Sequence, residues 1–173
     1  MESIYLIKAQ EITKEQANDF KAEFFRNKEM VINGSALLDQ LEYDEWIDRV
    51  NTNYVGGSEE WVTATTFFAK RTSDDHIVGI IDVRHTLGNT FLKEYGGHIG
   101  YAIRPSERRK GYATKMLKEA LKYCKSLGLD KIMIGCYQDN TASNKVIIRC
   151  GGKIKESKMF TDHKPMNIYE IVI

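Results

Sequence analysis

The chain has 173 residues, 42% hydrophobic and 28% charged, with 25 Lys and Arg against 24 Asp and Glu. This length predicts one domain with a core that needs no disulfide or metal staples. The composition excludes a disordered chain, a collagen-like repeat and a coiled coil. A formal net charge of +1 provides no overall attraction to nucleic acid or to an acidic membrane. We therefore expect a globular protein with neither kind of partner.

The cysteines and histidines give no sign of a metal site. Cys124, Cys136 and Cys150 are odd in number and widely spaced, which fits neither a disulfide framework nor a zinc site. The N-terminal residues show no basic start followed by an apolar stretch, and no apolar run approaches the length of a membrane span. The sequence predicts a cytoplasmic protein without a bound metal.

The first third of the chain shows helical periodicity. Thr13–Gln16 fits a capping box at a helix start. Apolar side chains then recur at helical spacing, namely Ala17, Phe20, Phe24 and Phe25. A second helical region is expected from Ser35 to Val50, either continuous or broken at Tyr43–Asp44.

The period then changes to that of strands. Expected strands cover Trp61–Lys70, His76–His85 and His98–Arg104. The strongest amphipathic helix is expected over Thr114–Leu127. After it we expect a strand at Lys131–Tyr137, a helix at Asn140–Cys150 and strands at Lys153–Phe160 and Met166–Ile173. This order predicts a mixed α/β sheet with an antiparallel meander and one parallel step.

The segment Arg108–Ala113 has the features of an anion site. It lies between an expected strand and the strongest helix, where backbone N–H groups are unsatisfied and the helix dipole is positive. Gly111 allows close approach of a phosphate, and three cations precede it. The Walker and dinucleotide-binding patterns are absent. The alternative is a solvated basic turn that caps a helix.

Arg108-x-x-Gly111-x-Ala113 matches the [RQ]-x-x-G-x-[GA] signature, and this part of the chain resembles the GNAT superfamily of N-acetyltransferases. The strand before Pro105 resembles the family's fourth strand, and Asn140-x-x-Ser143 with its later glycine turn resembles the next strand–helix unit. The resemblance implies one domain, 1–173, with an acetyl-CoA-binding core at 76–173 and a variable helical acceptor side at 1–60. It also implies an α/β (α+β) fold, with a mostly antiparallel central sheet, helices on both faces and a splayed parallel strand pair.

The resemblance further implies acetyl-CoA as co-substrate and a primary amine of a small molecule or peptide as acceptor; a homodimer also fits. The implied cofactor-binding residues are Ala102, Ile103, Arg104, Arg108, Arg109, Lys110, Gly111, Tyr112, Ala113, Thr114, Asn140, Ser143 and Lys145. Asn140 can equally act as a helix cap, and Lys145 as a solvated surface lysine.

The catalytic groups are less well marked. Many members of the family have a tyrosine that acts as the general acid four residues after the Ser or Ala, and that position is Ile147 here. We expect His98 to be the general base, because the unperturbed pKa of histidine is near neutrality, with Asp82 and His85 as weaker candidates. Acidic residues also cluster in the helical region. We expect them either to attract a cationic amine substrate or to form a solvated helix face. They are Asp39, Glu42, Asp44, Glu45 and Asp48.

These observations favour an enzyme that moves an acetyl group from acetyl-CoA to a primary amine. The alternative is a CoA-binding sensor or interaction module without transfer activity. A second alternative, a nucleic-acid-binding protein, is supported only by the basic turn, and the nearly balanced net charge argues against it.

Overall fold

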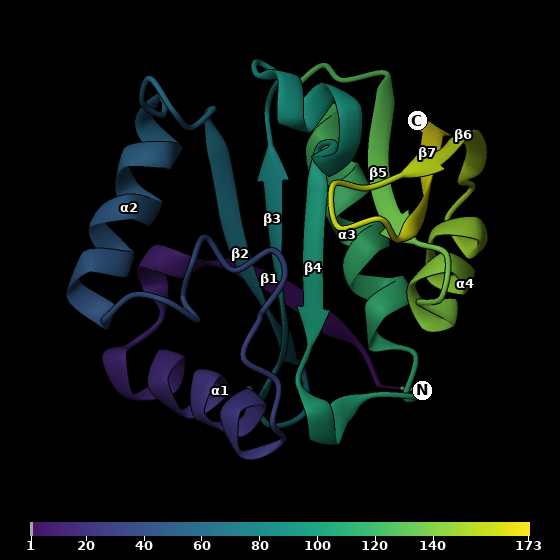
Figure 1. The fold of residues 1–173 in the computed structure, drawn as a ribbon. Coiled ribbons are helices and arrows are strands. Elements are labelled where there is room, and N and C mark those ends of the chain that lie inside the picture. Colours follow the sequence, from purple (N-terminus) through teal and green to yellow (C-terminus); the bar gives the residue numbers. More distant parts are fainter. Residues whose placement is uncertain (1) are drawn as a thin grey trace.

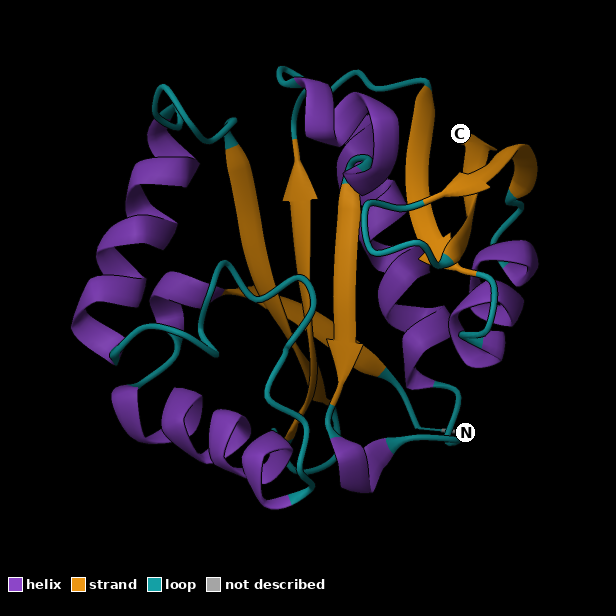
Figure 2. Ribbon diagram, viewed as in Figure 1, coloured by secondary structure: helices purple, strands orange, loops and turns teal. Residues whose placement is uncertain are grey.

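The computed structural model describes residues 2–173 (Figures 1 and 2). The strands are β1 (Ile4–Lys8), β2 (Ala64–Arg71), β3 (Ile77–Arg84), β4 (Ile99–Ile103), β5 (Lys131–Tyr137), β6 (Lys153–Met159) and β7 (Pro165–Val172). The α-helices are α1 (Lys14–Arg26), α2 (Tyr43–Val55), α3 (Tyr112–Ser126) and α4 (Thr141–Arg149). Short helical turns are η1 (Ala9–Glu11), the π-helix η2 (Leu92–Gly96) and η3 (Pro105–Glu107).

The strands form two antiparallel sheets, in the orders β1-β2-β3-β4 and β5-β7-β6. β4 and β5 run in the same direction side by side (Figure 1), yet within residues 2–173 they share no ladder. They are joined where β4 begins, by an isolated bridge between Gly97 and Ile134. The predicted fold class, with helices on both faces and a splayed parallel pair, is confirmed.

Two apolar cores lie on opposite faces of the first sheet. Phe68 and Ile80 pack with α1 and α2, whereas Phe67 and Ile81 pack with α3 and the second sheet. Neighbouring residues of one strand thus enter different cores, as the two-residue period of a strand requires. α1 and α2 cover one face of the sheet and α3 the other (Figure 2).

The structure corrects three sequence-based boundaries. β1 was not predicted, and β2 begins at Ala64 rather than at Trp61. The second helix begins at Tyr43 instead of Ser35, because Ala36 and Leu37 have φ values of +53° and +68° and the segment forms turns. Left-handed residues cannot continue a right-handed helix.

The turns before α2 bring a loop across β4. A Cβ on Gly34 would lie 2.0 Å from the carbonyl oxygen of Gly100, so the two backbones meet where only glycine fits. Ile32 donates its N–H to Asp39 at 2.9 Å and closes the loop. This loop becomes one wall of the cleft described below.

Candidate active site

The loop before α3 presents free backbone N–H groups. Arg109 and Gly111 have φ values of +63° and +81°, and α3 begins at Tyr112, two residues earlier than expected. The first helical bond there is the one from Lys115 N–H to the Gly111 carbonyl, at 3.4 Å. In residues 2–173 the N–H groups from Arg109 to Thr114 have no protein acceptor. A left-handed turn followed by a helix start forms a concavity suited to a phosphate.

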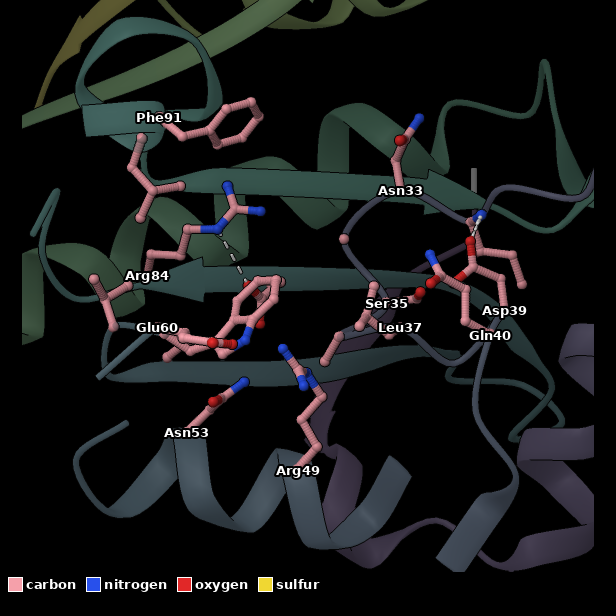
Figure 3. Close-up of a pocket in the computed structure, with 18 of the residues that line it drawn as sticks. Asn33, Ser35, Leu37, Asp39, Gln40, Arg49, Asn53, Glu60, Arg84 and Phe91 are labelled. Atoms are coloured by element: carbon pink, nitrogen blue, oxygen red, sulfur yellow. Dashed lines mark hydrogen bonds and ion pairs between the residues drawn. The ribbon is translucent and has the colours of Figure 1, made fainter. Parts of the chain in front are cut away.

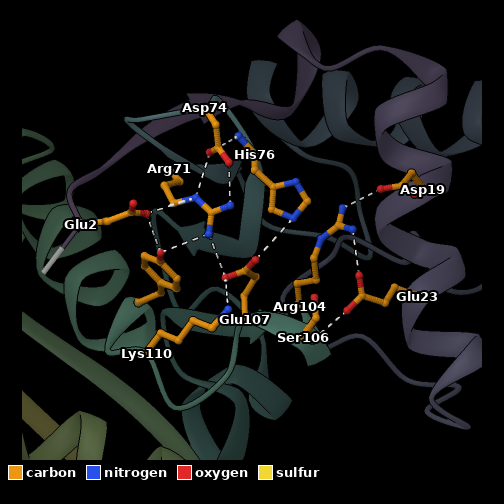
Figure 4. A network of polar contacts seen from close by, with 11 residues as sticks. Glu2, Asp19, Glu23, Arg71, Asp74, His76, Arg104, Ser106, Glu107 and Lys110 are labelled. Atoms are coloured by element: carbon orange, nitrogen blue, oxygen red, sulfur yellow. Dashed lines mark hydrogen bonds and ion pairs between the residues drawn. The ribbon is translucent and has the colours of Figure 1, made fainter.

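An ion network lies beside this loop (Figure 4). Glu107 is 6% exposed, and its carboxylate accepts from Arg71 at 3.1 Å and from Lys110 at 3.0 Å. Arg71 also pairs with Asp74 at 2.7 Å, and this contact lowers the pKa of Asp74 to about 2. The network holds the ammonium of Lys110 at the loop, although its charge is partly matched by Glu107.

Two arginines tie the helical region to β4. Arg108 donates two bonds of 2.7 Å to Glu29 and one of 3.2 Å to the carbonyl of Ile103. These bonds lower the pKa of Glu29. Arg104 is 4% exposed and bonds Asp19 and Glu23, each at 2.9 Å. Its side chain therefore points to α1 and not to the gap beside β5 (Figure 4).

The backbone of β4 faces the gap at alternate residues. The N–H of Arg104 bonds Val78 of β3, and the carbonyl of His98 accepts from Arg84, so even-numbered residues pair with β3. Antiparallel alternation then turns the N–H and C=O of Tyr101 and Ile103 toward β5. Of the three β4 residues predicted along the cofactor arm, Ile103 has its backbone groups in the gap.

α4 lies below the gap. Asn140 caps it by accepting the N–H of Ser143 at 3.1 Å, and the Ser143 hydroxyl bonds the Tyr101 hydroxyl at 2.6 Å. Burial raises the pKa of Tyr101. Lys145 is exposed, whereas Ile147 is 0% exposed and belongs to the core shared with α3. The hydrogen bond between the Tyr101 and Ser143 hydroxyls therefore connects β4 to α4.

His98 bridges β4 and β5 where they separate. The backbone N–H of His98 donates to the Met133 carbonyl at 2.7 Å, and the ring Nδ1 of His98 accepts the backbone N–H of Met133 at 3.0 Å. Burial lowers the pKa of His98, and the charge of Arg84 lowers it further. Because Nδ1 is an acceptor, neutral His98 carries its proton on Nε2. In that tautomer Nδ1 holds the hydrogen bond that links His98 to β5. Proton uptake at Nδ1 would break this bond, so the arrangement does not favour His98 as a base.

A cleft of about 440 Å³ opens on the α2 face of the sheet (Figure 3). Its walls are the loop 31–40, α2, the residues 60–64, part of β3 and the start of the segment 89–92. Arg49 and Asn53 rise into it from α2, and Arg84 comes from β3 (Figure 3). Asp82, also of β3, lines the cleft as well. Charged side chains from two elements therefore converge in one small cavity beside β4.

Asp82 is the deepest carboxylate of the cleft and is 7% exposed. It accepts from Thr66 Oγ1 at 2.8 Å, and its other oxygen lies 3.5 Å from Arg84 Nε. Burial raises the pKa of Asp82 against the opposing charge of Arg84. In the β3–β4 register Asp82 stands opposite Gly100, next to the gap-facing Tyr101. A carboxylate with a raised pKa is suited to accept a proton.

Other predicted groups lie elsewhere. His85 bonds Thr65 at 2.8 Å on the α3 face, away from the cleft. Of the acidic set, Asp39 lines the cleft, while the other four do not. Arg49 and Asn53 were not predicted as site residues from the sequence. The pattern that could have indicated them is a polar pair at i and i+4 beside the buried apolar residues of the same helix.

The described residues contain no group of three or more His, Cys, Asp or Glu side chains that could hold a metal. None of the helices in this part of the chain is long and apolar enough to cross a membrane.

Residues 9–153 match the family model for the acetyltransferase (GNAT) domain. A curated relative, the uncharacterized N-acetyltransferase YoaA of Bacillus subtilis, is 30% identical over 86 residues, which cover 46% of this chain and 49% of that protein. The aligned part thus spans about half the length of the relative.

Two solved structures show the same fold. One is the acetyltransferase that modifies the N-terminal serine of a 50S ribosomal subunit protein in Salmonella typhimurium, with a TM-score of 0.69, 15% identity and coverage of 99% and 95% of the two chains. The other is the dodecameric spermidine N-acetyltransferase of Vibrio cholerae, with a TM-score of 0.67, 14% identity and coverage of 98% and 93%.

Proposed function

The chain belongs to the GNAT acetyltransferase family, and from this premise we propose that it transfers the acetyl group of acetyl-CoA to a primary amine. The observation that carries the proposal is the loop before α3, where the N–H groups from Arg109 to Thr114 have no acceptor within residues 2–173. These groups fit a pyrophosphate. Beside them, Tyr101 and the N–H of Ile103 offer backbone groups to the pantetheine arm, while the Ile103 carbonyl already accepts from Arg108. Ser143 contacts Tyr101 at the same gap, and Asn140 caps the helix that carries Ser143.

The reaction joins the amine nitrogen to the thioester carbonyl carbon and breaks the carbon–sulfur bond. The amine loses a proton, and the leaving thiolate of CoA takes one up. A thiol of this kind has a pKa near that of cysteine, about 8.5, so its thiolate leaves without a dedicated acid. The oxyanion of the tetrahedral state needs N–H donors, and Tyr101 supplies one at the gap.

Two residues are candidates for the base. His98 stays a prediction, but its Nδ1 is occupied by the Met133 N–H. Asp82 lines the cleft and has a raised pKa, because burial disfavours its charged form. We favour Asp82 for proton uptake from the amine, and we propose that His98 holds β4 and β5 at their point of separation.

One observation favours the second candidate function, CoA binding without transfer. Position 147 holds isoleucine, whose side chain has no hydroxyl to act as an acid, and this side chain is fully buried in the core. Release of free thiol from acetyl-CoA with a panel of amines separates the two functions. Amine-dependent thiol release supports the transferase. Tight acetyl-CoA binding in calorimetry without thiol release supports the binding module.

We also propose a cytoplasmic location, supported by three free cysteines in the described chain, which suit a reducing compartment. A homodimer stays a prediction, tested by light scattering.

A further inference from the structure

The cleft contains a guanidinium without a partner. Nε and Nη2 of Arg49 are buried and have no hydrogen-bond partner among the described residues 2–173, and the guanidinium carbon lies 4.0 Å from the centroid of the Trp61 ring. Burial lowers the pKa of Arg49. Arg49 as a whole is half-buried, and the charges of Glu60 and Asp82 oppose the effect of burial on its pKa without forming a hydrogen bond to Nε or Nη2. These two buried donors cost free energy while they stay unsatisfied, so they indicate a group that an anion from outside the chain completes. The stacking on Trp61 fixes the plane of the guanidinium and so the direction of its donors.

The neighbouring arginine is different. Arg84 donates from Nη1 to the carbonyls of Gly96 and Gly97, each at 3.2 Å, and its Nε faces Asp82 at 3.5 Å. These contacts fix Arg84 and offset its charge. Arg49 is therefore the cation of the cleft that is left to bind a ligand, and Arg84 adds positive potential nearby.

The same cleft offers acceptors for an ammonium or amine. Asp82 lies at its floor, and Asp39 Oδ1 is buried without a hydrogen-bond partner in the part of the chain that the structure describes. Ser35 is 2% exposed, and its hydroxyl also lacks a partner in that part of the chain. Unpartnered donors and acceptors in one cavity suit a ligand that carries both charges.

The rim of the cleft is apolar. Val31, Trp61 and Phe91 line it and are 67%, 43% and 54% exposed. Large apolar side chains exposed together around a polar cavity mark a binding surface. An acceptor with an apolar body would bury them.

Resting on the proposed transferase activity, we propose that the acceptor is a small amine that also carries an oxyanion, as an apolar amino acid does. Its carboxylate, or an equivalent oxyanion, binds Arg49; its amine lies toward Asp82; and its apolar group contacts the rim. A cavity of about 440 Å³ suits such a molecule. A polyamine, by contrast, would place a cation against Arg49.

The test compares acceptors that differ in the oxyanion alone. Phenylalanine is paired with 2-phenylethylamine and leucine with 3-methylbutylamine, and the phosphonate analogue of phenylalanine distinguishes the two kinds of oxyanion. Spermidine serves as the cationic comparison. We expect kcat/KM for thiol release to be at least roughly 10-fold higher for each anionic member, the scale of a hydrogen bond to a charged group. Equal or higher rates with the decarboxylated amines or with spermidine would overturn the proposal.

Arg49→Gln should raise KM for phenylalanine by roughly 10- to 100-fold and leave KM for 2-phenylethylamine unchanged. Arg49→Lys should keep part of the preference, because a lysine retains the charge and loses the planar fork. Arg26→Gln is the matched control, since Arg26 is exposed at the end of α1. A KM increase of equal size for both acceptors in Arg49→Gln would refute the assignment.

A binding measurement separates this proposal from the transferase proposal. N-acetylphenylalanine should bind wild type with CoA present, and Arg49→Gln should lose that binding in calorimetry. If no amine releases thiol but this pattern holds, the transferase proposal fails and the anion site stands. If amines are acetylated but N-acetylphenylalanine binds wild type and variant equally, the anion site fails and the transferase stands.

Discussion

Replacing Ile147 by tyrosine tests whether this position faces the core or the gap. Ile147 is 0% exposed and belongs to the core cluster on the α3 face. Its surroundings have no spare room, since a Cβ on Gly152 would lie 2.5 Å from Ile147 Cγ2. Tyrosine would overpack the site, at about 1–3 kcal/mol. Its hydroxyl would be buried without a designed partner, at about 1–3 kcal/mol more.

The two costs together predict that the free energy of unfolding of Ile147→Tyr falls by about 2–6 kcal/mol. For a domain of this size each kcal/mol corresponds to ~2–4 °C, so the melting temperature should fall by roughly 5–20 °C. Ile147→Val is the matched control and should lose only about 0.5–1.5 kcal/mol. Thermal melts with and without acetyl-CoA measure both variants. A tyrosine variant that melts like wild type and turns over faster would show that position 147 faces the thioester, and would refute the reasoning.

Three further predictions concern the loop and the cleft. Gly111→Glu should abolish acetyl-CoA binding in calorimetry, because a carboxylate would enter the phosphate site; unchanged affinity would contradict the site. Asp82→Asn should lower kcat by roughly 10²–10⁴. In wild type the rate should rise with pH through the raised pKa of Asp82, because only the carboxylate accepts a proton, and this limb should vanish in the variant. If it persists, another base acts. His98→Ala should remove the brace to Met133 and raise KM for acetyl-CoA more than it lowers kcat, whereas loss of kcat alone with a changed pH profile would restore His98 as the base.

The sequence was informative where structure is local. The capping box at Thr13–Gln16 is present, with both of its hydrogen bonds at 3.2 Å. The strand–loop–helix unit around Gly111 and the strands and α-helices from β3 onward also follow from period and turn chemistry, whereas the short helices η2 and η3 were not predicted. The turns at Ala36 and Leu37 could not be predicted, because neither residue type favours a left-handed φ; they follow Gly34, which packs on Gly100 of a distant strand.

The site was predictable only in part, for the same reason. A phosphate loop is contiguous in sequence, whereas the cleft joins α2, β3 and a loop that are far apart in the chain. The partnerless state of Arg49 and the occupied Nδ1 of His98 depend on those long-range neighbours. The ordinary pKa of histidine therefore favoured His98 over Asp82 in the sequence, and burial in the folded chain favours Asp82.

The pairing of Arg108 with Glu29 has a consequence for how the two ligands affect each other's binding. Glu29 lies two residues before Val31, where the wall of the cleft starts, so one ion pair connects the phosphate loop to the acceptor side. If acetyl-CoA restrains Arg108, it also restrains that wall, and the two ligands then bind with a coupling free energy. Such coupling is reciprocal: the acceptor must tighten acetyl-CoA by the same factor by which acetyl-CoA tightens the acceptor. Breaking the ion pair should therefore weaken this mutual tightening of both ligands by the same factor.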